Sequence, residues 1–153
     1  MTDTTDQEAI GGLYFRLFNE IGIISQLSRA MFEARLPDGL VLPHFTVINH
    51  LIRVQDGQTP LALARAFQVP KTSMTHTLAG LEKRGLVEMR VNPDDARSKQ
   101  VWLTDAGRAF RDQAIAGIAP DVGAFADALE VEDLKQVISK LEHLRKRLDA
   151  ARD

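Results

Sequence analysis

Cysteine is absent from the 153 residues of the sequence. Disulfides, thiolate–metal chemistry and peroxide sensing through a thiol are therefore excluded, and the absence fits a reducing compartment. Aromatic residues make up only 6% of the chain, which is too few for a surface that stacks the bases of single-stranded nucleic acid. No apolar run approaches the roughly 18 residues that a membrane span needs, and the polar residues 1–8 lack the apolar centre of a signal peptide. We therefore expect a cytoplasmic protein without a membrane partner.

Residue sets typical of catalysis or metal binding are also missing. The histidines are scattered, and the closest pair, His44 and His50, is six positions apart, which places the two about 240° apart around a helix. There is no glycine loop that would cradle a phosphate and no nucleophile elbow. We expect no enzymatic activity, no cofactor and no metal site.

The chain as a whole carries little excess charge, but its middle segment is basic. The net charge is −2, whereas residues 60–100 contain seven basic and four acidic side chains, a balance of +3 that leaves −5 for the remainder. A basic module within an acidic frame is typical of proteins that bind duplex nucleic acid, because lysine and arginine neutralise phosphates.

Two apolar patterns with helical spacing precede this basic segment. Residues 10–36 predict one long amphipathic helix that ends near residues 37–39, since apolar side chains recur at intervals of three or four. A second helix is predicted from Pro43 to about residue 56, where Gly57 suits a helix C-cap.

A pair of short helices is predicted next. Thr59 and Pro60 form a helix start signal, because the hydroxyl accepts from a free N–H and proline has no N–H to leave unpaired. The first helix covers residues 61–67, Pro70 breaks it, and the second helix covers about residues 71–85. Two short helices separated by a tight break form a helix-turn-helix.

A β-hairpin is predicted after the helix pair. Residues 86–91 and 100–103 alternate like paired strands around the polar loop 92–99. Such a hairpin beside a helix-turn-helix is a wing.

Helical patterns continue to the end of the chain. A helix capped by Thr104 runs toward Pro120, where it should kink or stop, and a last helix covers about residues 132–150. The apolar stripes of the first and last helices are either intramolecular core or a dimer interface. We favour a dimer, because one helix-turn-helix covers only a few base pairs and useful affinity generally comes from two half-sites.

The fold class predicted is therefore mainly α with a small β-hairpin wing, in a single domain, 1–153. A winged helix-turn-helix DNA-binding lobe at 43–104 is flanked by long N- and C-terminal dimerisation helices at 8–36 and 105–150.

The wing sequence resembles a known family signature. Residues 92–107, NPDDARSKQVWLTDAG, are similar to the pattern D-P-x-D-x-R-x-x-x-V-x-L-T-x-x-G of the MarR (multiple antibiotic resistance regulator) family and match seven of its eight fixed positions. Asn92 replaces the usual aspartate, and Asp94 and Ala96 stand where relatives often have basic residues, which implies weaker wing electrostatics. Residues 42–51 and 78–87 resemble the second helix and the end of the recognition helix of the family.

The resemblance implies a homodimer with two winged lobes on a palindromic operator in double-stranded DNA. It also implies a small-molecule effector, expected to be aromatic or phenolic, that relieves repression.

Helical spacing divides the second helix of the pair into a core face and a DNA face. Met74, Leu78 and Leu81 point to the core, and the opposite face enters the major groove. That face holds Thr72, Ser73, His76, Ala79, Gly80 and Lys83.

Three side chains of this face are polar enough to read base edges, and two lysines are placed to hold phosphates. The readers are Thr72, Ser73 and His76, with Thr75 beside them. The lysines are Lys71 and Lys83. Alternatively, Thr72 or Ser73 caps the helix, and His76 is an inert surface histidine.

In the wing, Arg97 is the residue expected to enter a minor groove, where A·T-rich DNA concentrates negative potential. Asp95 would hold its guanidinium, and Lys99, Ser98 and Arg90 would touch the DNA backbone. The alternative is a solvated hairpin tip with a surface ion pair. Trp102 is expected to pack against the base of the hairpin.

An effector pocket would sit where the dimerisation helices meet the lobe, near Arg16, His44 or Asn49, although His44 also suits a structural role. The competing function is a winged-helix protein-interaction module without specific DNA binding. A small hydrolase is a third alternative, for which the sequence offers no catalytic group.

Overall fold

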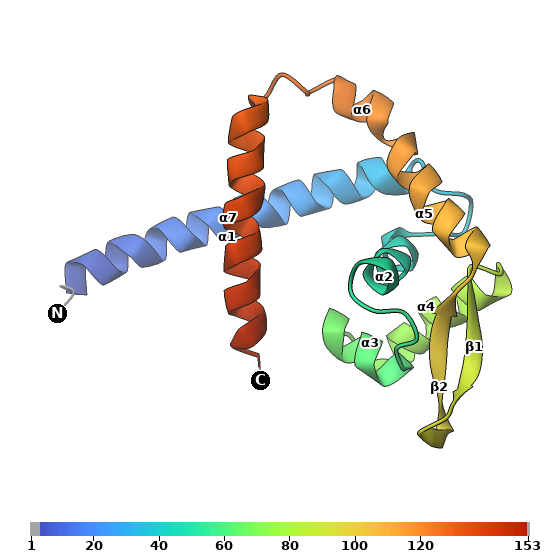
Figure 1. The fold of residues 1–153 in the computed structure, drawn as a ribbon. Helices are drawn as coiled ribbons and strands as arrows, with labels where there is room; N and C mark the ends of the chain where they lie inside the picture. Colours follow the sequence, from blue (N-terminus) through green and yellow to red (C-terminus); the bar gives the residue numbers. More distant parts are fainter. Residues whose placement is uncertain (1–3, 153) are drawn as a thin grey trace. The chain divides into compact units, whose positions relative to one another are not determined.

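A computed structural model describes residues 4–152, which divide after Ile118 into two compact units. The first contains α1 (Thr4–Glu33), α2 (Leu42–Arg53), α3 (Pro60–Phe67), α4 (Lys71–Lys83), β1 (Val87–Asn92), β2 (Asp95–Leu103) and α5 (Asp105–Gly117). The second contains α6 (Ala119–Gly123) and α7 (Val131–Ala150). Figure 1 shows these elements, and the predicted fold class, mainly α with a winged helix-turn-helix, is confirmed.

The helix-turn-helix is built by the expected start signal and by an unexpected turn residue. Thr59 Oγ1 accepts from the N–H of Ala62 at 3.2 Å, and Pro60 occupies the first helical position of α3. The turn contains no glycine because Gln68 itself adopts the left-handed conformation, with φ 52°. Its N–H donates to the carbonyl of Ala64, so the end of α3 is satisfied before α4 begins.

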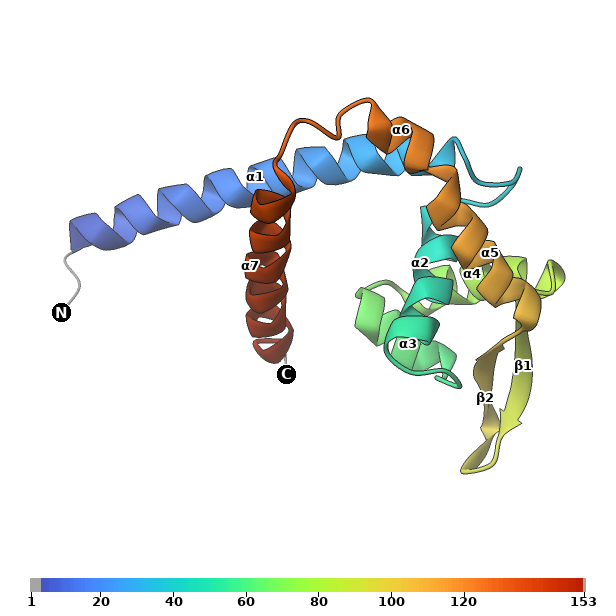
Figure 2. The ribbon, with the colours of Figure 1, turned by 45° about the horizontal axis from the view of Figure 1, so that its top comes forward.

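The lobe closes around one apolar core. The predicted core positions of α4, Met74, Leu78 and Leu81, are all buried. They pack with side chains from α2, α3 and the hairpin, of which Ile48, Leu51, Leu63, Val87 and Val101 are almost completely buried. Around this core, α4 and the hairpin lie beside each other (Figure 2).

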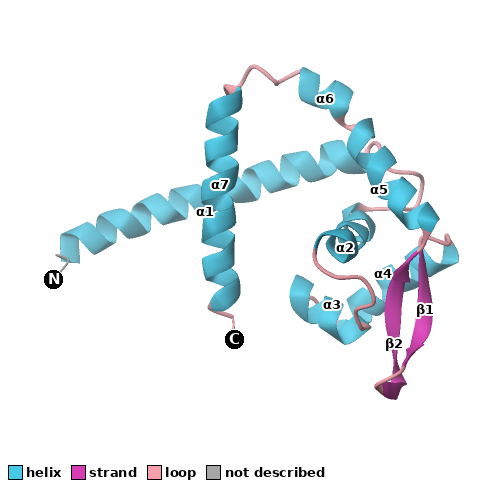
Figure 3. Cartoon of the chain, viewed as in Figure 1, coloured by secondary structure: helices cyan, strands magenta, loops and turns pink. Residues whose placement is uncertain are grey.

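The hairpin is longer than its apolar alternation predicts. β1 and β2 pair in antiparallel register from Val87↔Leu103 to Val91↔Lys99, and Asn92 then pairs with Asp95 (Figure 3). The predicted loop 92–99 is therefore slightly too long, because Lys99 pairs with Val91, and Asn92 pairs with Asp95 across a tight turn at Pro93 and Asp94.

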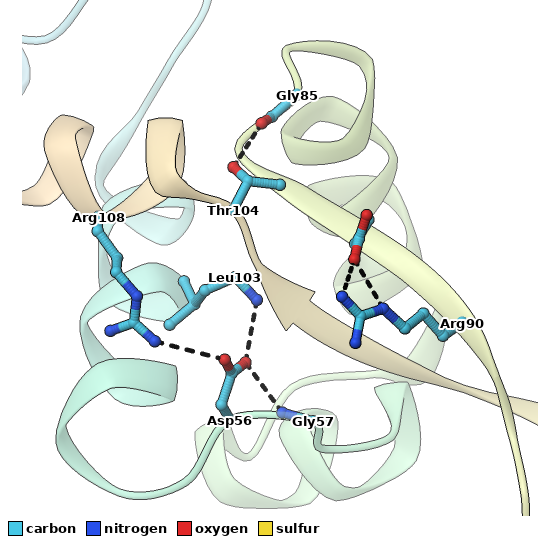
Figure 4. A network of polar contacts seen from close by, with 8 residues as sticks. Asp56, Gly57, Gly85, Arg90, Leu103, Thr104 and Arg108 are labelled. Atoms are coloured by element: carbon cyan, nitrogen blue, oxygen red, sulfur yellow. Dashed lines mark hydrogen bonds and ion pairs between the residues drawn. The ribbon is translucent and has the colours of Figure 1, made fainter.

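A carboxylate anchors the base of this hairpin. Asp56 Oδ1, at the end of α2, accepts from the N–H of Gly57 at 2.9 Å and from the N–H of Leu103 at 3.0 Å. Its other oxygen lies 3.6 Å from the guanidinium of Arg108 in α5 (Figure 4). Thr104 caps α5 as predicted, accepting from the N–H of Gly107.

The long helices start and stop near the predicted positions. Helix α1 begins at Thr4 rather than near residue 10, and the helix expected to run toward Pro120 ends at Gly117, two residues before α6. Within the described chain, neither α1 nor α7 contains a buried residue. No helix of residues 4–152 has the length and apolar character to span a membrane.

Candidate nucleic-acid interface

The recognition helix α4 presents the predicted polar side chains together. All six side chains assigned to DNA on this helix are exposed: Lys71, Thr72, Ser73, Thr75, His76 and Lys83. The buried stripe of Met74, Leu78 and Leu81 lies on the opposite side and turns these residues outward.

The outward face is narrower than predicted. Gly80 was expected to face DNA, but a Cβ at this position would lie 2.9 Å from Nε2 of His44 in α2. Gly80 therefore belongs to a helix–helix contact, where the absence of a side chain makes room for an imidazole. Thr72, His76 and Lys83 remain near the centre of the exposed face.

Side-chain capping of α4 by Thr72 or Ser73, the alternative role for these residues, is wrong. The N-cap is Pro70, and no side-chain hydrogen bond caps the first turn of this described helix. The hydroxyl of Thr75 donates to the carbonyl of Lys71 at 2.9 Å, which leaves its methyl group outward. The uncapped turn is a place where backbone N–H groups attract a phosphate.

The wing presents one long basic side chain at its tip. The side chain of Arg97 is 92% exposed, and its Nε lies 3.2 Å from Oδ1 of Asp95. The same oxygen accepts from the N–H of Arg97 at 3.0 Å. The ion pair expected between Asp95 and Arg97 is thus present. Lys99 is exposed on the same strand.

Arg90 is held within the hairpin. Its Nε donates to Oε1 of Glu88 at 2.6 Å (Figure 4). Its guanidinium carbon lies 5.1 Å from the centre of the Trp102 ring. The indole in turn lies against Gly57, where it leaves no room for a Cβ. Trp102 packs at the hairpin base as expected, and the guanidinium of Arg90 lies over its ring.

An apolar cavity of about 220 Å³ lies within the first unit. It is lined by four elements: Arg29 from α1; Leu42, Pro43, Thr46 and Val47 from α2; Phe67 and Val69 from the end of α3; and Ser73, Met74 and Thr77 from α4. The recognition helix is therefore one of its walls. The guanidinium of Arg29 is its one basic group among these lining residues, and it also pairs with Glu33 at 3.0 Å.

The residues predicted at an effector site lie outside this cavity. Arg16 is exposed on α1, and Asn49 accepts from Nε of Arg111 at 3.3 Å. His44 is buried, and its Nδ1 accepts from the N–H of Val41 at 3.0 Å to form part of the capping box of α2. None of these three described residues is among those that line the cavity.

Burial lowers the pKa of His44 below its ordinary value of 6.5, and the positive charges of Arg84 and His76 in and after α4 lower it further. The imidazole is therefore neutral where it contacts Gly80, with Nδ1 as acceptor toward α2.

An exposed polar recognition helix, a preceding short helix and a β-hairpin wing with exposed Arg97 and Lys99 define a winged helix-turn-helix, a class in which one helix enters the major groove. Residues 38–98 match the model of the MarR family. This is the family whose wing signature residues 92–107 resemble, and the matched segment contains the helix-turn-helix and most of the wing.

Solved structures share this fold. The apo form of wild-type MarR from E. coli is 25% identical, with a TM-score of 0.67 over 86% of this chain and 96% of that one. PcaV from Streptomyces coelicolor, in complex with its natural ligand, is 23% identical, with a TM-score of 0.62 over 92% of each chain. CouR from Rhodococcus jostii RHA1, bound to p-coumaroyl-CoA, is 22% identical, with a TM-score of 0.64 over 81% of this chain and 87% of that one.

Proposed function

We propose that this protein is a transcription regulator of the MarR family, a sequence-specific repressor that binds a palindromic operator as a homodimer and is released by a small-molecule effector. The observation that carries the proposal is the pairing of an exposed polar face on α4 with an exposed arginine at the wing tip of the same rigid lobe. The two elements suit adjacent grooves of one duplex.

The DNA-binding roles follow from exposure and chemistry. Thr72, Ser73 and His76 read base edges in the major groove, and Thr75 presents a methyl group suited to thymine or a hydroxyl oxygen near a phosphate. Lys71, Lys83 and Lys99 contact phosphates, which position the protein without specifying sequence.

Arg97 enters the minor groove, oriented by Asp95. Arg90 and Ser98, the other two expected backbone contacts, make hydrogen bonds inside the hairpin. We assign them to the wing's structure rather than to the DNA.

The homodimer is supported by apolar side chains that the described chain leaves exposed. On α1 they include Leu13, Phe15, Ile24 and Leu27, and on α7 they include Leu134, Val137, Ile138 and Leu148. Covering such faces with a second copy removes apolar surface from water. A two-fold dimer would also set two recognition helices about 34 to 36 Å apart, which is one turn of DNA.

The effector site is best supported at the cavity between α1, α2, α3 and α4. Its lining is mostly apolar, with Arg29 and three hydroxyl side chains as the polar groups, a composition that suits an aromatic or phenolic acid. CouR, a structural neighbour, is bound to a phenolic thioester. An occupant would touch Ser73 and Thr77 on α4 and so bias the position of the reading face.

The alternative is a winged-helix protein-interaction module without specific DNA binding. Salt separates the two functions, because phosphate contacts release counterions and weaken steeply as salt rises.

The test is fluorescence anisotropy with labelled duplexes from the DNA that flanks the gene, measured across a salt series. Arg97→Ala should weaken binding roughly tenfold and reduce the salt slope by about one. Lys135→Ala, an exposed lysine on α7 paired only with Glu132 at 4.0 Å among the contacts of the described residues, is the matched control and should change neither. Unchanged affinity and slope in Arg97→Ala would remove the wing from the DNA interface.

A further inference from the structure

The wing tip contains a bulge that isolates Arg97. Val91 pairs with Lys99, and the next residue of β1, Asn92, pairs with Asp95. In this described hairpin, residues 96–98 therefore have no partners across the ladder. A bulge re-aims the side chain that it carries, and Arg97 is at the centre of this one.

Side-chain hydrogen bonds close the bulge from both strands. Asn92 Nδ2 donates to Ser98 Oγ at 3.0 Å, and Ser98 Oγ donates to the carbonyl of Asp95 at 3.2 Å. Asn92 Oδ1 accepts from the N–H of Asp94 at 3.0 Å. One amide thus joins the turn on one side to the far end of the bulge on the other.

The orientation of Arg97 depends on this closure. Asp95 Oδ1 accepts both from the N–H and from Nε of Arg97, and the carbonyl of the same Asp95 is held by Ser98. Loss of the Ser98 hydroxyl would free the bulge and let the Asp95–Arg97 pair move with it. A long side chain that is 92% exposed has no packing to hold it otherwise, and disorder would cost entropy on binding.

An amide at position 92 allows Ser98 to bond to residue 92 and to the carbonyl of Asp95 at the same time. The aspartate of the family pattern could accept from the N–H of Asp94, but an ionised carboxylate cannot donate to Ser98. The single hydroxyl proton of Ser98 is already used on Asp95, so it is not available for a phosphate in this conformation.

We infer that Asn92 and Ser98 are positioning residues for Arg97, which hold the wing arginine for the minor groove without touching DNA themselves. This inference rests on the proposed DNA-binding function. The departure of Asn92 from the family pattern then changes how the tip is held, in addition to removing a charge.

A double-mutant cycle tests the inference, with operator affinity measured for wild type, Ser98→Ala, Arg97→Ala and the combined variant. Ser98→Ala should weaken binding about fivefold, the equivalent of one hydrogen bond, when Arg97 is present. The same change should have no effect in the Arg97→Ala background. Ser98→Thr keeps the hydroxyl and should restore affinity, and Asn92→Ala should behave like Ser98→Ala.

Each outcome supports or overturns the positioning role of Ser98 and Asn92. An equal loss from Ser98→Ala in both backgrounds would show a direct DNA contact by Ser98 and overturn the inference while leaving the proposed function intact. If Arg97→Ala itself leaves affinity unchanged, the wing assignment fails and the inference fails with it. Unfolding midpoints of all variants, compared in parallel, separate a local effect from a loss of fold.

Discussion

The winged lobe and the long helices α1 and α7 differ in how far their apolar side chains are exposed to water. In the lobe, Leu81, Val101 and Ile48 are essentially inaccessible to water, whereas Leu27 on α1 and Val131 on α7 are 68% and 67% exposed. All of these elements have apolar residues at helical or strand spacing. An apolar stripe in the sequence therefore identifies a face that needs a partner surface. Only the packing shows whether that partner surface belongs to the same compact unit.

The largest effects are expected when one buried leucine of the lobe and one exposed leucine of α7 are each replaced. Leu81→Ala should lower the free energy of unfolding by about 3 kcal/mol, because it leaves a cavity in a closed core. Leu134→Asp on α7 should alter the stability of an isolated chain by less than about 0.5 kcal/mol, since the site is exposed there, but should raise the dimer dissociation constant at least about 100-fold through a buried, unpaired charge.

Urea unfolding measures the first effect, and sedimentation velocity over a range of protein concentrations measures the second. A Leu134→Asp protein that sediments as wild type does at every concentration would contradict a role for α7 in assembly.

Gly80→Ala sharpens the comparison within the lobe. Alanine favours a helix over glycine by about 1 kcal/mol, but here its methyl group would meet the buried His44 ring. Overpacking should outweigh propensity and destabilise the protein by about 1 to 2 kcal/mol, with weaker operator binding because α4 shifts. Thermal unfolding and anisotropy provide the measurement.

The double variant Gly80→Ala, His44→Asn is the control for this prediction. Asparagine keeps an acceptor for the N–H of Val41 but lacks the ring atom nearest Gly80, and so it should recover part of the loss. A stabilised Gly80→Ala single variant would show that the helix contact is loose.

The smallest expected effect is on pH dependence. Burial lowers the pKa of His44, and burial also lowers that of His50, which shares a hydrogen bond with Gln58. Below the ordinary value of 6.5 the unfolded chain therefore binds more protons than the folded one, and stability should fall as pH drops from about 6.5. In urea titrations at successive pH values, His44→Asn should show a shallower fall than wild type. An identical fall in both proteins would contradict a buried neutral His44.

Local signals predicted much of the fold and much of the exposure of the candidate site. The Thr59 cap, the Met74, Leu78 and Leu81 stripe and the wing signature each act within a few residues, so they remain readable without tertiary structure. The exposure of Lys71, Thr72 and His76 follows from the same helical periodicity.

Contacts between distant segments were not readable in this way. The small size of Gly80 has two explanations, close approach to DNA and close approach to another helix, and only the position of His44 distinguishes them. The cavity that we propose for the effector is lined by residues of several separate segments of the chain, so no single segment contains its signal. Gln68 adopts the left-handed backbone conformation, which ordinarily favours glycine. It does so because the core holds α3 and α4 on either side of the turn.

At the wing, the residues alone indicated one arginine, Arg97, and its pairing with Asp95, because both side chains belong to one short pattern. Only the folded hairpin revealed the bulge and the Asn92–Ser98 bond, since strand register decides which side chains meet across a ladder. Periodicity and caps therefore determined which elements form and which faces are apolar. Tertiary packing decided which of those faces are closed, which polar groups are already committed, and how the wing arginine is held.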